Sequence, residues 1–220
     1  MAVPFQVRRL GVVPYEEALE LQRRLVEERK AGSIPDQLLL LQHPPVITLG
    51  ARVRSDRSHV LATEAMLDEA GVALFEAGRG GDVTYHGPGQ LVVYPLIDMR
   101  RRGLGVRELV VALENGIIAM LASRNVVAVG RRDAPGIYVE GRKLASIGLR
   151  IRRGCSYHGL AFNVAMDLEP FRRINPCGYR GLEVIDLRTL GVSLELRSAA
   201  ELLAPHLLAA LGMPLEARWV

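Results

Sequence analysis

The stretch LLLLQHPPVITL, residues 38–49, decides the fold. Its two apolar runs, Leu38–Leu41 and Val46–Leu49, have the length and composition of buried strands. His43-Pro44-Pro45 separates the runs, and a proline cannot donate a hydrogen bond to a strand ladder. The sequence therefore predicts two buried strands joined at a stiff corner.

A helix is predicted on the N-terminal side of this stretch. Residues 15–30 place apolar side chains such as Leu21 and Leu25 on one side and charged side chains on the others, and Gly32 follows as a stop signal. Such an amphipathic helix needs an apolar surface to cover. We expect it to pack on a sheet.

The rest of the chain adds further helices and strands. Helices are expected over residues 63–70, 106–124 and 194–211, and strands over residues 72–77, 91–97, 126–129, 136–140, 144–151 and 158–164. Strands and helices alternate at first and strands then cluster, which predicts an α/β (α+β) fold with helices packed on a mixed sheet. No strand is followed by G-x-G-x-x-G and a helix, so a dinucleotide-binding fold is not expected.

Length and composition indicate one globular domain over residues 1–220. A chain of 220 residues can bury a single large core. Its 49% hydrophobic and 24% charged residues match an ordinary globular balance rather than a disordered chain. Because no run of eighteen apolar residues occurs and the start MAVPFQVRRL lacks the features of a signal peptide, we expect a cytoplasmic protein without a membrane segment.

The charge pattern bears on partners. The net charge of +4 comes from scattered arginine pairs, which fit either a solvated surface or a basic landing face for an acidic partner. Nucleic acid is a poor candidate, because no Lys/Arg-rich block with interleaved aromatic residues occurs. Lys30 and Lys143 are the only lysines, so the position of Lys143 in a glycine-flanked segment suggests a specific role for it.

A glycine-rich segment, RGGDVTYHGPGQ at residues 79–90, is the first candidate for chemistry. Its glycines allow close backbone approach, so several N–H groups can face a ligand, with Arg79, Tyr85 and His86 as polar side chains. The alternative is a pair of tight turns around a short strand. Both interpretations remain open on composition alone.

Lys143 lies in a second segment, GRKLASIG at residues 141–148. The Gly-Arg pair is typical of a hairpin turn, where a lysine is usually solvated. Alternatively, Lys143 lies at the start of a strand and faces a cleft. There its ammonium group would stabilise a thiolate, or its neutral amine would carry a proton.

Two cysteines are present, and their spacing fits neither a metal site nor a disulfide framework. Cys177 lies between proline and glycine in NPCG, which suits an exposed nucleophile, although a lone cysteine is more often a small buried hydrophobic residue. Cys155 follows a turn-like Arg-Gly pair and is expected to be structural. As a nucleophile, Cys177 would need a nearby positive charge or base.

His158 begins the segment HGLAFNV. It is either a residue that contacts a ligand or a strand-end residue whose hydrogen bonds are made within the protein. No two histidines have the spacing of metal ligands on a helix, and H-E-x-x-H does not occur. We expect no metal and no cofactor.

Taken together, four segments resemble the lipoyl (octanoyl) transferases: RGGDVTYHGPGQL, GRKLASIGL, HGLAFNV and NPCG. Each is weak alone, but their order and content are specific, and the resemblance extends from His43 to about Leu190. It implies the catalytic fold of the biotin protein ligases and lipoate-protein ligases. It also implies that Cys177 is the acyl-thioester nucleophile and that Lys143 activates it. The substrate-binding positions that it suggests are Arg79, Gly80, Gly81, Asp82, Val83, Thr84, Tyr85, His86, Ser146, Ile147, Gly148, Gly159, Leu160 and Ala161. His158, which directly precedes the last three, is added to them as a candidate ligand contact.

The resemblance further implies an activity and its partners. The acyl group would be octanoyl, the donor acyl carrier protein, and the acceptors the lipoyl domains of 2-oxoacid dehydrogenases and the glycine-cleavage H protein. A monomer is expected. Two alternatives stay open: an ATP-dependent lipoate-protein ligase, in which no cysteine nucleophile is needed, and a non-catalytic module that binds carrier or lipoyl domains through its arginines.

Overall fold

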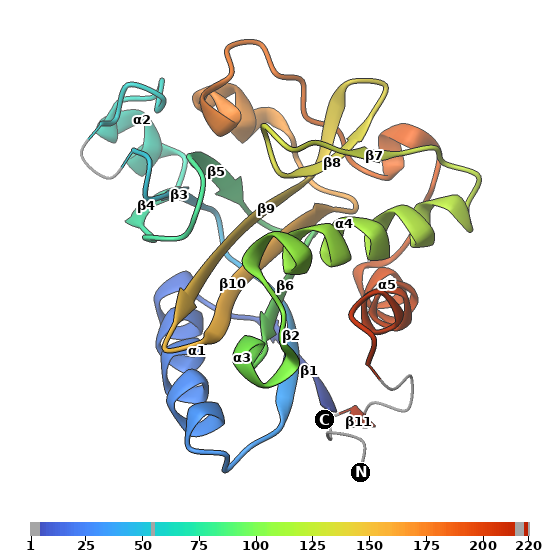
Figure 1. The fold of residues 1–220 in the computed structure, drawn as a ribbon. Coiled ribbons are helices and arrows are strands. Elements are labelled where there is room, and N and C mark those ends of the chain that lie inside the picture. Colours follow the sequence, from blue (N-terminus) through green and yellow to red (C-terminus); the bar gives the residue numbers. More distant parts are fainter. Residues whose placement is uncertain (1–4, 54–55, 214–217, 220) are drawn as a thin grey trace.

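In the computed structural model, which describes residues 5–53, 56–213 and 218–219, the strands form a large and a small mixed sheet (Figure 1). In spatial order the large sheet contains β11 (Arg218–Trp219), β1 (Phe5–Val12), β2 (Asp36–Gln42), β6 (Gln90–Leu96), β10 (Cys155–Asn163), β9 (Arg142–Arg152), β8 (Gly136–Val139) and β7 (Val129–Gly130). Strand β1 is parallel to β2 and β11, and the other pairs are antiparallel.

The small sheet has the order β4 (Ala73–Glu76), β3 (Val46–Leu49) and β5 (Val83–His86). The His-Pro-Pro corner carries the chain from β2 in the large sheet to β3 in the small one. The His43 ring is buried and holds this corner, since Nδ1 lies 2.7 Å from the carbonyl oxygen of Val13 and Nε2 lies 2.7 Å from Tyr94 Oη. The predicted pair of strands with a stiff corner is confirmed.

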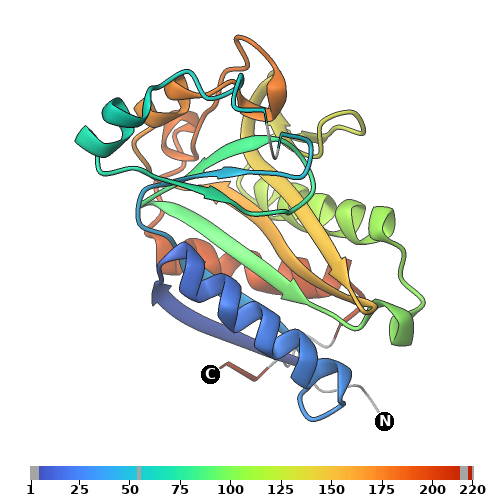
Figure 2. The same cartoon turned by 90° about the vertical axis from the view of Figure 1, so that its left-hand side faces the viewer.

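Helices cover both faces of the large sheet. Figure 2 shows α1 (Tyr15–Lys30) in front of the sheet, with α4 (Val106–Ala122) and α5 (Leu196–Ala210) behind it. Successive side chains of a strand point to opposite faces, so Leu39 and Leu41 of β2 pack with α1, while Leu38 and Leu40 pack with α4 and α5. This two-sided burial explains the continuous leucine run.

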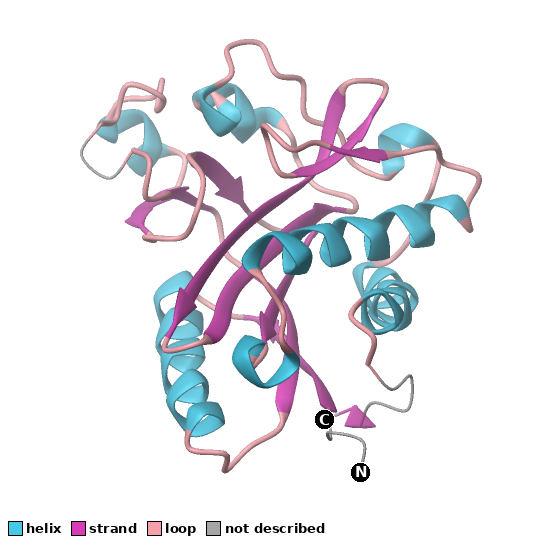
Figure 3. Cartoon of the chain, in the orientation of Figure 1, coloured by secondary structure: helices cyan, strands magenta, loops and turns pink. Residues whose placement is uncertain are grey.

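Shorter elements complete the chain (Figure 3). They are α2 (Glu64–Glu69), α3 (Met99–Arg102) and the 3₁₀ turns Glu169–Arg173, Pro176–Gly178 and Arg188–Leu190. Ile47 and Tyr85 of the small sheet share a third apolar core with Phe171 and Ile174 from the first of these turns and the residue after it. This core anchors the segment that leads to Cys177.

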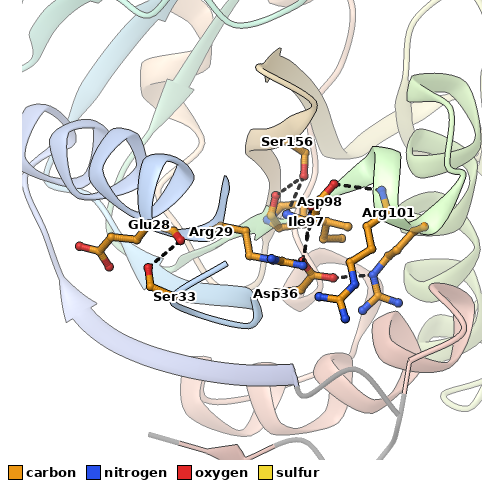
Figure 4. Close-up of polar contacts among 10 residues, drawn as sticks. Glu28, Arg29, Ser33, Asp36, Ile97, Asp98, Arg101 and Ser156 are labelled. Carbon is orange, nitrogen blue, oxygen red and sulfur yellow. Dashed lines mark hydrogen bonds and ion pairs between the residues drawn. The ribbon is translucent and has the colours of Figure 1, made fainter. Parts of the chain in front are cut away.

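A buried ion cluster ties α1, β2 and α3 together (Figure 4). Arg29 Nε and Arg102 Nε each donate to one carboxylate oxygen of Asp36, which is fully buried, and the backbone N–H of Asp98 donates to Asp36 Oδ1 over 3.0 Å. A buried carboxylate requires such partners. The cluster thereby fixes the start of β2 against the end of α1 and the start of α3.

The predicted mixed sheet with packed helices is confirmed, as is the helix over residues 15–30. One expected strand needs correction, and one strand of the structure was not expected. The strand expected over residues 126–129 is limited to Val129–Gly130, and Val127 is 86% exposed, so its apolar character did not lead to burial. Strand β1 was not predicted, because its pairing with β2 shifts register between Arg9 and Gly11 and breaks the alternation. In the glycine-rich segment the structure shows the short strand β5 between a bend and a turn, which is one of the two interpretations that the sequence left open.

No helix within the described ranges is long and apolar enough to span a membrane.

Candidate active site

Cys177 lies at the centre of a one-turn 3₁₀ segment, Pro176–Gly178, and is partly exposed. Its φ of 57° lies in the left-handed region, which a cysteine rarely adopts. Two backbone hydrogen bonds hold the turn: Asn175 N–H donates to the carbonyl of His59 over 2.8 Å, and Gly178 N–H donates to the carbonyl of Asn175 over 2.9 Å. The sulfur is therefore presented from a fixed turn rather than a free loop.

Lys143 is the second residue of β9, and its side chain is buried. Its Nζ lies 3.0 Å from Cys177 Sγ, 2.9 Å from Tyr138 Oη and 3.4 Å from the carbonyl oxygen of Pro135. Its backbone bonds to Glu183 and Ile185, which brings the segment after Cys177 alongside β9. The structure thus brings the predicted cysteine and lysine into direct contact.

The hydrogen-bond partners around Nζ can accommodate an ammonium group. The Tyr138 hydroxyl donates its one proton to the carbonyl of Ala134 over 2.8 Å, so it accepts from Lys143. The Pro135 carbonyl also only accepts. With the sulfur as third acceptor, all three N–H bonds of an ammonium group are used.

The segment Ala134–Tyr138 forms a socket for this lysine. Gly136 has φ +144°, and a Cβ placed on it would lie 2.3 Å from the carbonyl oxygen of Ala145 and 3.2 Å from Lys143 Nζ. The Gly136 N–H donates to Glu114 Oε1 of α4 over 3.0 Å. Burial raises the pKa of Glu114, while its bond to Gly136 and the charge of Lys143 act in the opposite direction. Only a glycine at position 136 leaves room for the lysine side chain.

A narrow pocket runs inward from Cys177. Its walls come from α1, β5, β6, β9, β10 and the loop before β5. The residues that line it are Tyr15, Arg79, Gly81, Asp82, Val83, Thr84, His86, Tyr94, Ser146, Ile147, Gly148, His158, Gly159, Leu160, Ala161 and Cys177. Most of the predicted substrate-binding residues are therefore brought together around one cavity.

Two predicted binding residues lie elsewhere. The side chain of Tyr85 packs on Phe171 in the third core, with ring centroids 5.5 Å apart, so it is not on the pocket wall. Gly80 lines a second pocket that Cys177 also borders, together with Val106, Pro135 and Tyr179. Cys177 thus contributes to the walls of two adjoining pockets.

Arg79 is a buried cation in the pocket wall. Its guanidinium donates to the side-chain and backbone oxygens of Thr48 and to the carbonyl of Gly80. Burial lowers the pKa of Arg79, and the nearby Tyr15 and Cys177 act in the opposite direction. An arginine held in this way adds positive potential close to Cys177.

The pocket wall also carries Tyr15, His86, Tyr94 and His158, and His43 packs behind them. Burial lowers the pKa of His43 to about 4 and that of His158 to about 3, and it lowers the pKa of His86 well below its usual value. These histidines are neutral at physiological pH. Burial also raises the pKa of Tyr15 to about 12, so its hydroxyl keeps its proton.

Sequence reasoning missed three tyrosines of this region: Tyr15, Tyr94 and Tyr138. Tyr15 begins α1, Tyr94 lies within β6 and Tyr138 lies within β8, so only the tertiary structure brings them to the site. No local pattern around them signals a ligand. Cys155, predicted to be structural, is the buried first residue of β10.

Among the described residues, no group of three His, Cys, Asp or Glu side chains is arranged to hold a metal ion.

Comparison with known proteins shows the family of this chain. Residues 14–207 match the family described as the lipoyl protein ligase A/B catalytic domain. An octanoyltransferase of Alkalilimnicola ehrlichii is 54% identical over 206 residues, which cover 94% of this chain and 92% of the relative. An octanoyltransferase of Nitrosococcus oceani is 46% identical over 207 residues, covering 94% of this chain and 88% of the relative.

Solved structures show the same fold at low identity. Lipoate-protein ligase A bound with ATP superposes with a TM-score of 0.76 at 14% identity, covering 100% of this chain and 90% of that one. Biotin protein ligase from Aquifex aeolicus gives a TM-score of 0.55 at 11% identity, covering 96% of this chain and 70% of that one. The expected relation to both ligase folds is confirmed.

Proposed function

The chain belongs to the octanoyltransferase family and carries the lipoyl protein ligase A/B catalytic domain, and from this premise we propose its substrates and mechanism. It takes an octanoyl group from acyl carrier protein onto Cys177 and delivers it to a lysine amine of a lipoyl domain, the first step of endogenous protein lipoylation. The acceptors are the lipoyl domains of 2-oxoacid dehydrogenases and the glycine-cleavage H protein. The enzyme acts in the cytoplasm as a monomer, with residues 1–220 as one catalytic domain.

One observation carries this proposal: Lys143 Nζ and Cys177 Sγ are 3.0 Å apart, and Cys177 lines a narrow pocket. The pocket suits the acyl tail, and burying about seven methylene or methyl groups at ~0.8 kcal/mol each contributes on the order of 5 kcal/mol. The adjoining pocket that Cys177 also borders leaves access for the donor thioester and then for the acceptor amine. Residues of the three predicted binding segments line most of the first pocket.

In the first step the Cys177 thiolate attacks the thioester carbonyl of the donor. A carbon–sulfur bond to Cys177 forms, the bond to the carrier sulfur breaks, and Lys143 gives a proton to the departing thiolate. One thioester replaces another, so the step needs no ATP. Lys143 is then neutral, which prepares it for the next proton transfer.

In the second step the acceptor amine attacks the acyl-enzyme. A carbon–nitrogen bond forms, the bond to Cys177 breaks, and the nitrogen gives a proton to Lys143, which restores the thiolate and ammonium pair. Tyr138 acts as a positioning residue here. Tyr138 Oη and the Pro135 carbonyl accept the two N–H bonds of the neutral amine, which directs its lone pair toward Cys177.

An ATP-dependent ligase has no use for this cysteine–lysine contact, because an acyl adenylate reacts with an amine directly. The distinguishing experiment measures transfer of octanoyl from acyl carrier protein to a lipoyl domain in the absence of ATP. We expect turnover with parallel double-reciprocal lines when both substrates are varied, as a covalent intermediate requires. Intersecting lines, or an absolute need for ATP, would refute the proposal.

A further inference from the structure

Part of the wall of the pocket beside Cys177 is polar. A Cβ placed on Gly178 would lie 3.0 Å from Asp82 Oδ2, so Asp82 lies close to the Cys177 turn. His86 of β5 and His158 of β10 line the same pocket as Asp82 and Cys177.

An octanoyl chain bound to Cys177 enters a pocket that these polar side chains line. Seven carbon–carbon bonds of about 1.5 Å in a zigzag advance by about 9 Å. A chain of this length attached at Cys177 lies against the wall formed by Tyr15, His86, Tyr94 and His158, because these residues and Cys177 line the same pocket. An alkyl pocket would ordinarily end in aliphatic side chains, so this polar wall needs a reason.

One nitrogen atom of this polar wall lacks a hydrogen-bond partner. His86 bonds through Nδ1 to Gln90 Oε1 and through Nε2 to Thr48 Oγ1, and Tyr94 Oη bonds to His43. In contrast, Nε2 of His158 has no hydrogen-bond partner among the described residues, although the residue is only 1% exposed. A buried polar atom in this state is uncommon and indicates that something else binds it.

The other ring nitrogen of His158 limits what that ligand can be. Nδ1 lies 3.4 Å from Tyr15 Oη, and the neutral ring carries a proton on one nitrogen only. If Tyr15 donates, Nε2 is a free donor; if Tyr15 accepts, Nε2 is a free acceptor. A hydroxyl group both donates and accepts, so it pairs with Nε2 in either tautomer.

We propose that the pocket accepts medium-chain acyl groups bearing a hydroxyl group on their last carbons, and that His158 Nε2 recognises this hydroxyl. The inference rests on the proposed function, because it requires the acyl chain to be attached at Cys177. It extends the substrate class from plain alkyl chains to oxygenated ones. The transfer chemistry is unchanged, since the hydroxyl group takes no part in bond making or breaking.

The test compares two donors, octanoyl and 8-hydroxyoctanoyl acyl carrier protein, by following the mass of the intact enzyme with time. For the unsubstituted protein we expect the two acylation rates to agree within about tenfold, because the hydroxyl finds a partner. In His158→Phe the ratio of the hydroxyoctanoyl rate to the octanoyl rate should fall by about tenfold or more, since the apolar ring leaves the hydroxyl unpaired.

The control is His206→Phe, on α5 and outside the pocket lining, which should leave both rates unchanged. Preference of the unsubstituted protein for octanoyl by more than about a hundredfold would overturn the proposal. An equal change of both rates in His158→Phe would also overturn it. Should the unsubstituted protein form no octanoyl adduct at all, the proposed function itself would fail, and that outcome is distinct from the others.

Discussion

Three buried neutral histidines should make the protein sensitive to mild acid. Burial lowers the pKa of His43 to about 4, that of His158 to about 3, and that of His86 well below its usual value. In the unfolded chain each histidine titrates near 6.5. Around pH 5 the unfolded chain therefore binds about three more protons than the folded protein, and unfolding becomes easier as the pH falls.

The magnitude follows from this proton count. Three protons at about 1.4 kcal/mol each lower the free energy of unfolding by about 4 kcal/mol per pH unit near pH 5. This contribution to stability is fully present above pH ~6.5 and is lost as the pH falls toward the low pKa values that these histidines have in the folded protein. Glu114 acts in the opposite direction, because its raised pKa makes the folded protein hold a proton more tightly.

Urea unfolding followed by far-ultraviolet circular dichroism, at several values between about pH 7 and about pH 5, measures this dependence. His158→Asn should reduce the slope by about 1.4 kcal/mol per pH unit, whereas His206→Asn, outside the cluster, should not change it. A slope below about 1.4 kcal/mol per pH unit in the unsubstituted protein would refute the reasoning, because the histidines would then be able to take up protons without unfolding.

Three further predictions concern the catalytic pair and its socket. Lys143→Met should slow alkylation of Cys177 by iodoacetamide about tenfold or more at neutral pH, because the charge favouring the thiolate is gone; an unchanged rate would remove Lys143 from this role. Tyr138→Phe should slow aminolysis of the acyl-enzyme about tenfold and acylation by less, in single-turnover assays, since Tyr138 aims the neutral amine; equal effects on both steps would contradict this. Gly136→Ala should cost roughly 2–4 kcal/mol of stability, measured by urea unfolding, because its Cβ would collide with the backbone of Ala145, and an unchanged midpoint would count against the tight socket.

Some of this molecule could be predicted from local sequence. The leucine run at 38–41 and the proline corner predict β2 and its junction with β3, because buried strands and prolines act within a few residues. The Lys143 and Cys177 segments could be singled out because glycine and proline constrain the backbone beside them. Local chemistry was sufficient to single out the segments, whereas the roles of Lys143 and Cys177 came only from the resemblance to the family.

The surroundings of these residues could not be predicted in the same way. Tyr138 meets Lys143 only because β8 pairs with β9 through a register shift, which leaves no mark in the sequence. Tyr15 and His158 are 143 residues apart and meet only once α1 packs against β10. Such contacts depend on sheet order and helix placement.

The central claim is that the acyl group is carried on the sulfur of Cys177 next to Lys143. Its most direct test is the intact mass of the enzyme after incubation with octanoyl acyl carrier protein, followed by peptide mapping. The account predicts one octanoyl adduct, located at Cys177, kept in Cys155→Ala and lost in Cys177→Ala. An adduct that persists in Cys177→Ala, or one that depends on Cys155, would contradict the account.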